Sequence, residues 1–66
     1  MREWLKEKRI TKGYSQRKTA LLCGITQQYY NYIESGDRCP KPPVAQKIGE
    51  MLDFEWALFY SKDEIE

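Results

Sequence analysis

Three glycines divide the first part of the chain into short segments of similar length. They stand 11 and 12 residues apart, and a hydroxyl residue follows two of them at the second position. These residues are Gly13, Gly24 and Gly36, with Ser15 and Thr26. Glycine adopts the left-handed conformation that ends many helices, and a serine or threonine side chain caps the first turn of the next helix. The pattern predicts three short helices, the second at about residues 15–23 and the third at about 26–35.

The second part of the chain predicts a loop followed by two more helical segments. Three prolines lie within residues 40–43, where they exclude a continuous helix. Pro43 suits the first turn of a fourth helix, whose apolar side chains recur at helical spacing, and a short aromatic segment follows it. The sequence has no strand-like alternation. We therefore expect an all-α fold, a compact bundle of five short helices over residues 1–60, with a charged tail over 61–66.

Charged residues are distributed unevenly along the chain. The formal net charge is only +1, but residues 1–41 hold nine Lys or Arg against four acidic residues, whereas residues 42–66 hold two against six. A surface that binds an anionic partner on one side of the domain would produce this division, and so would ordinary solvated charge. The charge distribution alone leaves both interpretations open.

The chain lacks the residues that several classes of function require. The chain contains no histidine, its two cysteines form no CxxC pair, and it has no glycine-rich phosphate loop or nucleophile motif. We therefore expect no enzymatic activity, no metal site, no cofactor and no small-molecule substrate. No apolar run approaches the roughly 20 residues that span a bilayer, and the N-terminal residues lack the apolar core of a secretory signal. The expectation is a cytoplasmic protein without a membrane contact.

The predicted helix at about residues 26–35 has two chemically different faces. Helical spacing turns Tyr30 and Ile33 toward the core, and Ile25 reaches the core from the preceding turn. The opposite face carries uncharged hydrogen-bonding groups instead of the Lys and Glu of an ordinary solvent-facing surface. These groups belong to Gln27, Gln28, Asn31 and Tyr32. Glutamine and asparagine match the N6/N7 edge of adenine in the major groove, whereas charged side chains contact the phosphates. This face therefore predicts a helix that reads duplex DNA.

The pattern S-Q-x-x-x-A-x-x-x-G-I-T-x-x-x-Y-x-x-I-E-x-G over residues 15–36 resembles the helix-turn-helix of the lambda repressor-like (Cro/CI, Xre) DNA-binding family. The resemblance extends over about residues 2–60 and implies the lambda repressor-like fold. It also implies a structural ion pair, because Arg9 stands where the family often has an arginine that pairs with a glutamate at the end of the recognition helix, here Glu34. The implied function is sequence-specific binding of double-stranded DNA by a small prokaryotic or phage transcriptional regulator, a repressor of the Cro/Xre type.

Carried over residue by residue, the resemblance implies two sets of DNA contacts. The base-contacting residues are Gln27, Gln28 and Tyr32. The phosphate-contacting residues lie at helix N-termini, beside the recognition helix and in the proline loop. They are Ser15, Gln16, Arg17, Thr26, Tyr29, Asn31, Arg38 and Lys41.

The sequence departs from the family pattern at a few positions. Thr19 stands where a buried leucine is usual, which weakens the core slightly. Leu21 and Leu22 occupy positions that are often polar, so one of them is expected to be exposed or to pack against the last helical segment. Asp37 interrupts the basic loop and disfavours a phosphate contact by Arg38.

A dimer is expected because one recognition helix buries little DNA surface. Useful specificity then normally requires two copies on a pseudo-palindromic operator. We expect a homodimer through the C-terminal helix, with its exposed aromatic residues at the interface. These are Trp56, Phe59 and Tyr60.

Two other functions remain open at this level. The same fold can serve as an antitoxin or anti-repressor, a protein-interaction module in which the face of the third helix binds a protein partner. The clustered tyrosines could also bind single-stranded nucleic acid if their rings shared one surface. Helical spacing points Tyr29, Tyr30 and Tyr32 in different directions, which disfavours this second alternative.

Overall fold

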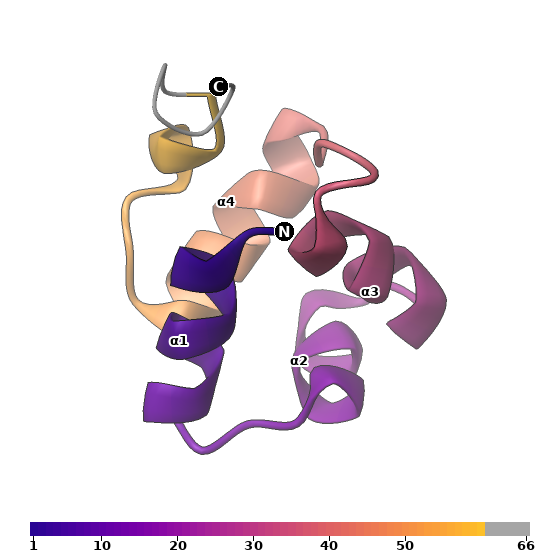
Figure 1. Ribbon diagram of the computed structural model, residues 1–66, viewed down its shortest axis with the longest axis vertical. Helices are drawn as coiled ribbons and strands as arrows, with labels where there is room; N and C mark the ends of the chain where they lie inside the picture. The colour runs from indigo at the N-terminus through magenta and orange to yellow at the C-terminus, as the bar shows by residue number, and fades with distance from the viewer. Residues whose placement is uncertain (61–66) are drawn as a thin grey trace.

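The computed structural model describes residues 1–60, which form helices and connecting loops with no strand in that range (Figure 1). Four α-helices are followed by a 3-10 helix. The elements are α1 Glu3–Thr11, α2 Gln16–Cys23, α3 Gln27–Ser35, α4 Pro42–Leu52 and η1 Trp56–Tyr60. The predicted all-α bundle is confirmed, with the difference that its fifth element is a 3-10 helix. The charged tail predicted for residues 61–66 lies outside the described residues.

Side-chain caps and left-handed glycines bound α2 and α3. The Oγ of Ser15 and the Oγ1 of Thr26 each accept a hydrogen bond from the backbone N–H three residues later, at 3.0 and 3.1 Å. Gly24 and Gly36 end the two helices at φ values of 72° and 93°, where other residues are strained. The predicted capping by both hydroxyl residues is confirmed. The turn between α2 and α3 therefore follows from local chemistry.

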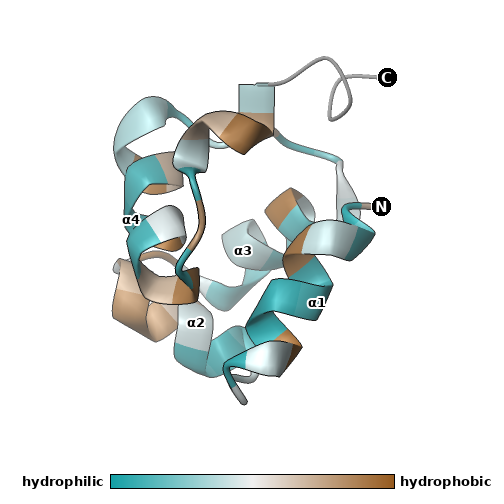
Figure 2. Cartoon of the chain, turned by 90° about the vertical axis from the view of Figure 1, so that its left-hand side faces the viewer, coloured by the Kyte–Doolittle hydropathy of each residue, from teal (hydrophilic) through white to brown (hydrophobic). Residues whose placement is uncertain are grey.

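One apolar core lies between the helices. Helix α2 packs against both α3 and α4, α1 contacts α3, and η1 packs on α4. Much of α1 is coloured as hydrophilic in Figure 2. The buried apolar side chains are Leu5, Ala20, Cys23, Tyr30, Ile33, Ala45, Ile48, Leu52 and Phe59.

Three aromatic rings join η1 to the start of the chain. The ring centroids of Trp4, Phe54 and Phe59 lie 5.2, 5.3 and 5.6 Å apart in edge-to-face and tilted arrangements. Only 1% of Phe59 is exposed. The prediction that Phe59 is an exposed residue of a dimer interface is therefore wrong. The register of η1 turns this ring into the core and leaves the neighbouring Tyr60 exposed.

Thr19 on α2 is completely buried, and its hydroxyl donates a hydrogen bond of 2.9 Å to the Ser15 carbonyl within the helix.

The outer side of α2 is more apolar than expected. Leu21 and Leu22 are both exposed, by 77% and 38%. They follow the buried Ala20 at 100° steps around the helix, which turns both away from the core.

Cys23 is buried and lacks the surroundings of a reactive thiol. Burial raises the pKa of Cys23 to about 11, against a smaller opposing effect of Lys47, so this thiol is protonated at neutral pH. Within residues 1–60, no group of three or more His, Cys, Asp or Glu side chains is placed to hold a metal ion. In the same range, no helix is long and apolar enough to cross a membrane.

The chain doubles back across α4 directly after this helix ends. Asp53 takes the left-handed conformation at φ 63°, and the Phe54 N–H donates a hydrogen bond of 2.9 Å to the Gly49 carbonyl. A Cβ atom on Gly49 would lie 2.8 Å from the Phe54 carbonyl oxygen and 3.1 Å from the Cβ of Trp56. The buried Gly49 therefore allows the segment that leads to η1 to cross α4 in close contact.

We predict that Gly49→Ala lowers the free energy of unfolding by roughly 1–3 kcal/mol, although alanine favours a helix interior, because the added methyl group has no space beneath Phe54. Chemical denaturation at pH 7 measures the change. Gln46→Ala, an exposed substitution on the same helix, is the control and should alter stability by about 0.5 kcal/mol or less. Wild-type stability of Gly49→Ala would contradict the close crossing.

Candidate nucleic-acid interface

The outer face of α3 presents a group of polar side chains to solvent. Gln27, Gln28 and Asn31 are exposed and Tyr32 is half-buried, whereas Tyr30 on the opposite face is completely buried. The two faces therefore differ as helical spacing predicts. Because Tyr30 faces the core, the tyrosines of this helix do not form one stacking surface for unpaired bases.

One edge of this outer face carries a row of three interacting side chains. The Nε2 of Gln28 donates a hydrogen bond of 3.0 Å to the hydroxyl of Tyr32, one turn further along α3. The guanidinium carbon of Arg38 lies 5.8 Å from the centroid of the Tyr32 ring, within the range of a cation–π contact. Two of the predicted base-contacting residues and one predicted phosphate-contacting residue are thus held next to one another.

Arg38 is held beside α3 by Arg2, from the start of the chain. Its backbone N–H donates a hydrogen bond of 3.2 Å to the Tyr32 carbonyl, and its carbonyl accepts one of 3.0 Å from the Nη1 of Arg2. The same Nη1 donates to the Ile33 carbonyl, and the Arg2 backbone N–H donates to the Glu34 carbonyl at 2.8 Å. Arg2 is only 8% exposed. It satisfies carbonyls at the end of α3, a role that sequence reasoning missed because nothing beside Arg2 in the chain marks it.

Asp37 forms hydrogen bonds with Ser35 at the end of α3. Its carboxylate accepts a hydrogen bond of 3.2 Å from the Oγ of Ser35, at the end of α3. The acidic residue in the loop therefore bonds to the helix end, while Arg38 lies within cation–π range of Tyr32.

The ion pair between Arg9 and Glu34 is present and buried. The Nε and Nη2 of Arg9 donate hydrogen bonds of 2.9 and 3.1 Å to the two carboxylate oxygens of Glu34, and its Nη1 donates one of 2.7 Å to the Tyr14 carbonyl. Their side chains are 11% and 1% exposed. The prediction of this pair is confirmed. Burial by itself raises the pKa of Glu34, but hydrogen bonds from Arg9 and Gln16 outweigh it, so the pKa lies below its ordinary value of 4.5.

Gln16, the first residue of α2, connects this ion pair to the outer face of α3. Its Nε2 donates a hydrogen bond of 3.1 Å to the Oε1 of Glu34, and its Oε1 accepts one of 3.1 Å from the Nδ2 of Asn31. Both Gln16 and Asn31 are predicted phosphate contacts. The structure shows that their amides bond to each other, which the spacing of 15 residues between them does not indicate.

The remaining predicted phosphate contacts lie at or near the starts of α2, α3 and α4. Ser15 and Thr26 are exposed at the starts of α2 and α3, where their oxygens cap the helix and leave the hydroxyl hydrogen for another acceptor. Arg17 is exposed in the first turn of α2, and Lys41 is exposed directly before α4. Tyr29 is half-buried and packs against the core.

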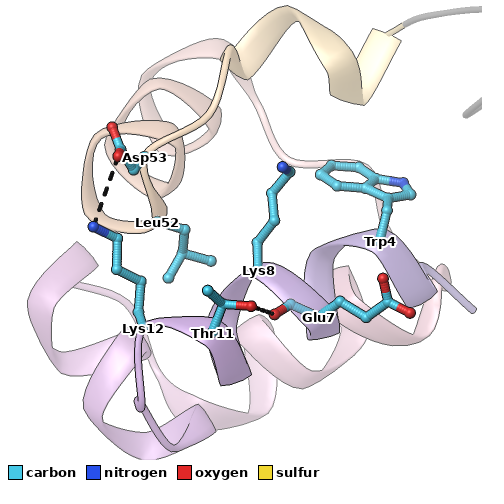
Figure 3. A pocket seen from close by; sticks show the side chains of 7 residues that line it. All are labelled: Trp4, Glu7, Lys8, Thr11, Lys12, Leu52 and Asp53. Carbon is cyan, nitrogen blue, oxygen red and sulfur yellow. Dashed lines mark hydrogen bonds and ion pairs between the residues drawn. The ribbon is translucent and has the colours of Figure 1, made fainter.

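A hollow of about 530 Å³ lies between α1 and the end of α4 and contains none of the predicted DNA contacts (Figure 3). Its lining residues are Trp4, Glu7, Lys8, Thr11, Lys12, Leu52 and Asp53. The ammonium of Lys12 and the carboxylate of Asp53 face each other at 3.8 Å on one side of it. Both groups are well exposed, so this pair adds little to stability.

Comparisons with known proteins agree with this geometry. A protein-family model described as helix-turn-helix matches residues 5–59, from within α1 to within η1. A curated relative, the uncharacterized HTH-type transcriptional regulator YqaF of Bacillus subtilis (strain 168), is 45% identical over 60 residues. The matched region covers 91% of this chain and 79% of the relative.

We predict that Glu34→Gln destabilises the fold by about 3 kcal/mol at pH 7, because Arg9 is left as a buried charge without its counter-ion. The folded-state pKa of Glu34 lies below the unfolded value, so the contribution of the carboxylate is present above about pH 4.5 and is lost as the pH falls through the folded-state pKa. The difference in stability between wild type and variant should therefore shrink toward acid pH. Urea denaturation at several pH values between 7 and 3 measures it.

Glu50→Gln is the control for this measurement, because Glu50 is an exposed carboxylate on α4. Its stability should follow that of the wild type at every pH. A difference between wild type and Glu34→Gln that stays constant from pH 7 to pH 3 would show that the Glu34 charge does not stabilise the fold.

Proposed function

The chain belongs to the helix-turn-helix family of DNA-binding transcription regulators, and on that premise we propose that α3 reads the base edges of a specific operator in the major groove. The observation that carries the proposal is the chemistry of the outer face of α3. It consists of uncharged donors and acceptors, and its edges carry Arg38 and the basic first turn of α2. Such a face bonds to bases through its centre and to phosphates through its rim.

The proposed contacts divide into two sets. Gln27, Gln28 and Tyr32 contact base edges. Phosphate contacts come from Ser15, Gln16, Arg17, Thr26, Tyr29, Arg38 and Lys41. The hydrogen bond between Gln28 and Tyr32 supports the first set, because it limits the rotamers of both side chains before DNA binds and so lowers the entropy lost on binding. The exposed N-termini of α2 and α3 support the second set, because they present free backbone N–H groups to an anion.

We further propose that the regulator is a repressor that acts by occupying its operator. Occupancy alone blocks access to a promoter, whereas activation requires an additional contact with the transcription machinery. Repression is therefore the regulatory outcome that needs the fewest interactions beyond the DNA-binding face.

A homodimer through the C-terminal segment would place two copies on a pseudo-palindromic operator, with half-sites about 34–36 Å apart. Trp56 is half-buried and Tyr60 is exposed, and their rings meet edge to face with centroids 6.0 Å apart. The Tyr60 hydroxyl donates a hydrogen bond of 2.6 Å to the Pro40 carbonyl, which holds the ring in place. An aromatic pair held in this way offers apolar area at a small entropic cost, which supports its use as an interface.

We predict that Gln28→Ala relaxes the preference at one operator position, with a loss of roughly 1–3 kcal/mol of discrimination. Lys41→Ala should instead weaken binding to every sequence alike and flatten the dependence of affinity on salt, because it removes a phosphate contact. Gel-shift titrations on a selected operator and on scrambled duplexes separate the two effects. Equal losses on both duplexes for Gln28→Ala would rule out base reading by this residue.

Tyr60→Glu should shift the protein from dimer to monomer in sedimentation experiments and abolish cooperative binding to two half-sites, while binding to one half-site persists. The new carboxylate would be buried without a partner in the proposed interface, which explains the expected loss. Ile10→Glu, which changes an exposed apolar residue on α1, is the matched control and should leave the dimer intact. A monomeric wild type at the concentrations that saturate the operator would contradict the proposed dimer.

A further inference from the structure

A continuous chain of hydrogen bonds runs from the buried core to the exposed face of α3. Arg9 donates to Glu34, the Nε2 of Gln16 donates to the Oε1 of Glu34 at 3.1 Å, and the Nδ2 of Asn31 donates to the Oε1 of Gln16 at 3.1 Å. The chain crosses three helices, beginning in α1 and ending at a side chain that is open to solvent.

The ionised end of this chain determines the orientation of both amides. A carboxylate accepts hydrogen bonds and cannot donate, so Gln16 must turn its NH₂ group toward Glu34. The carbonyl oxygen of Gln16 then faces Asn31, and Asn31 must turn its own NH₂ group toward Gln16. A flipped amide at either residue would bring two acceptors or two donors together.

Asn31 is left with one acceptor and one donor for a ligand. The bond to Gln16 does not use its Oδ1 or the second hydrogen on its Nδ2, and the residue is exposed. At 100° per residue, Asn31 lies between Gln27 and Gln28 around the helix, within the exposed arc of α3. An adjacent acceptor and donor of this kind match the N6 amino group and the N7 of adenine in the major groove.

We propose that Asn31 is a base-reading residue for adenine and that Gln16 is the positioning residue that sets the orientation of its amide. The inference rests on the proposed function of α3 as a recognition helix. It replaces the phosphate contact that the sequence implies for Asn31. A phosphate offers only acceptors, so it would leave the Oδ1 of Asn31 unpaired in the interface, whereas adenine pairs with both groups.

The test is selection of binding sites from random duplex DNA by four proteins: the wild type, Asn31→Ala, Gln16→Met and the double variant. Methionine keeps the length of the glutamine side chain and removes its hydrogen bonds. The wild type should select a motif in which one base pair carries an adenine preference that Asn31→Ala reduces at least about fivefold. Gln16→Met should weaken the preference at the same base pair and at no other, and the double variant should match Asn31→Ala.

Matched controls separate this effect from a loss of folding. Gln46→Ala, an exposed glutamine change on α4, should select the wild-type motif unchanged. Asn31→Ala changes an exposed helical residue to the best helix former, so it should fold at least as well as the wild type, which circular dichroism verifies. Base preference is the informative readout, because a merely structural effect of Gln16, or the loss of its proposed phosphate contact, would lower affinity for all sequences alike.

Three results would overturn all or part of the inference in distinguishable ways. If the wild type selects a motif but Asn31→Ala lowers affinity uniformly without a change at any base pair, Asn31 does not read a base and the proposed function of α3 stands. If the wild type selects a motif and the Asn31-dependent preference survives Gln16→Met unchanged, Gln16 has no positioning role. A wild type that enriches no motif would overturn the proposed sequence-specific function, and the inference with it.

Discussion

The bidentate ion pair between Arg9 and Glu34 is the interaction on which the arrangement of the recognition surface depends. The two residues are 25 positions apart, and their pairing sets α1 against α3. A buried carboxylate costs free energy to desolvate, and this cost is offset only when the geometry is good and the remaining hydrogen-bonding positions are filled. The Tyr14 carbonyl and the Gln16 amide fill them here. The pair therefore contributes more to a unique arrangement of helices than to net stability.

Helix α3 depends on such contacts because it is too short to be stable by itself. A nine-residue helix is marginal in water, since nucleation is unfavourable and few backbone hydrogen bonds follow it. Thr26 caps its start, Tyr30 and Ile33 bury its inner face, and Arg2 binds carbonyls at its end. These contacts stabilise α3 without burying its outer face in the core, so that face can carry polar groups for a ligand.

The polar groups on that face are restrained before any ligand arrives. Gln28 is bonded to Tyr32 along one edge, and Asn31, which lies between Gln27 and Gln28 around the helix, is bonded to Gln16. Restraint of this kind lowers the conformational entropy lost on binding and favours one orientation of each amide over the other. The proposed specificity thus draws on neighbours in α2 and the loop after α3 as well as on α3 itself.

The sequence by itself determined the features that depend on neighbouring residues: the capped ends of α2 and α3, the loop with three prolines, and the inward and outward faces of α3. Its resemblance to a known family also predicted the pair of Arg9 and Glu34. Only the tertiary structure decided that Phe59 is buried, that Arg2 binds the end of α3, and that Gln16 meets Asn31. These outcomes depend on contacts between residues far apart in the chain, such as Trp4 and Phe59, which helical periodicity and capping rules do not encode because both act within a few residues.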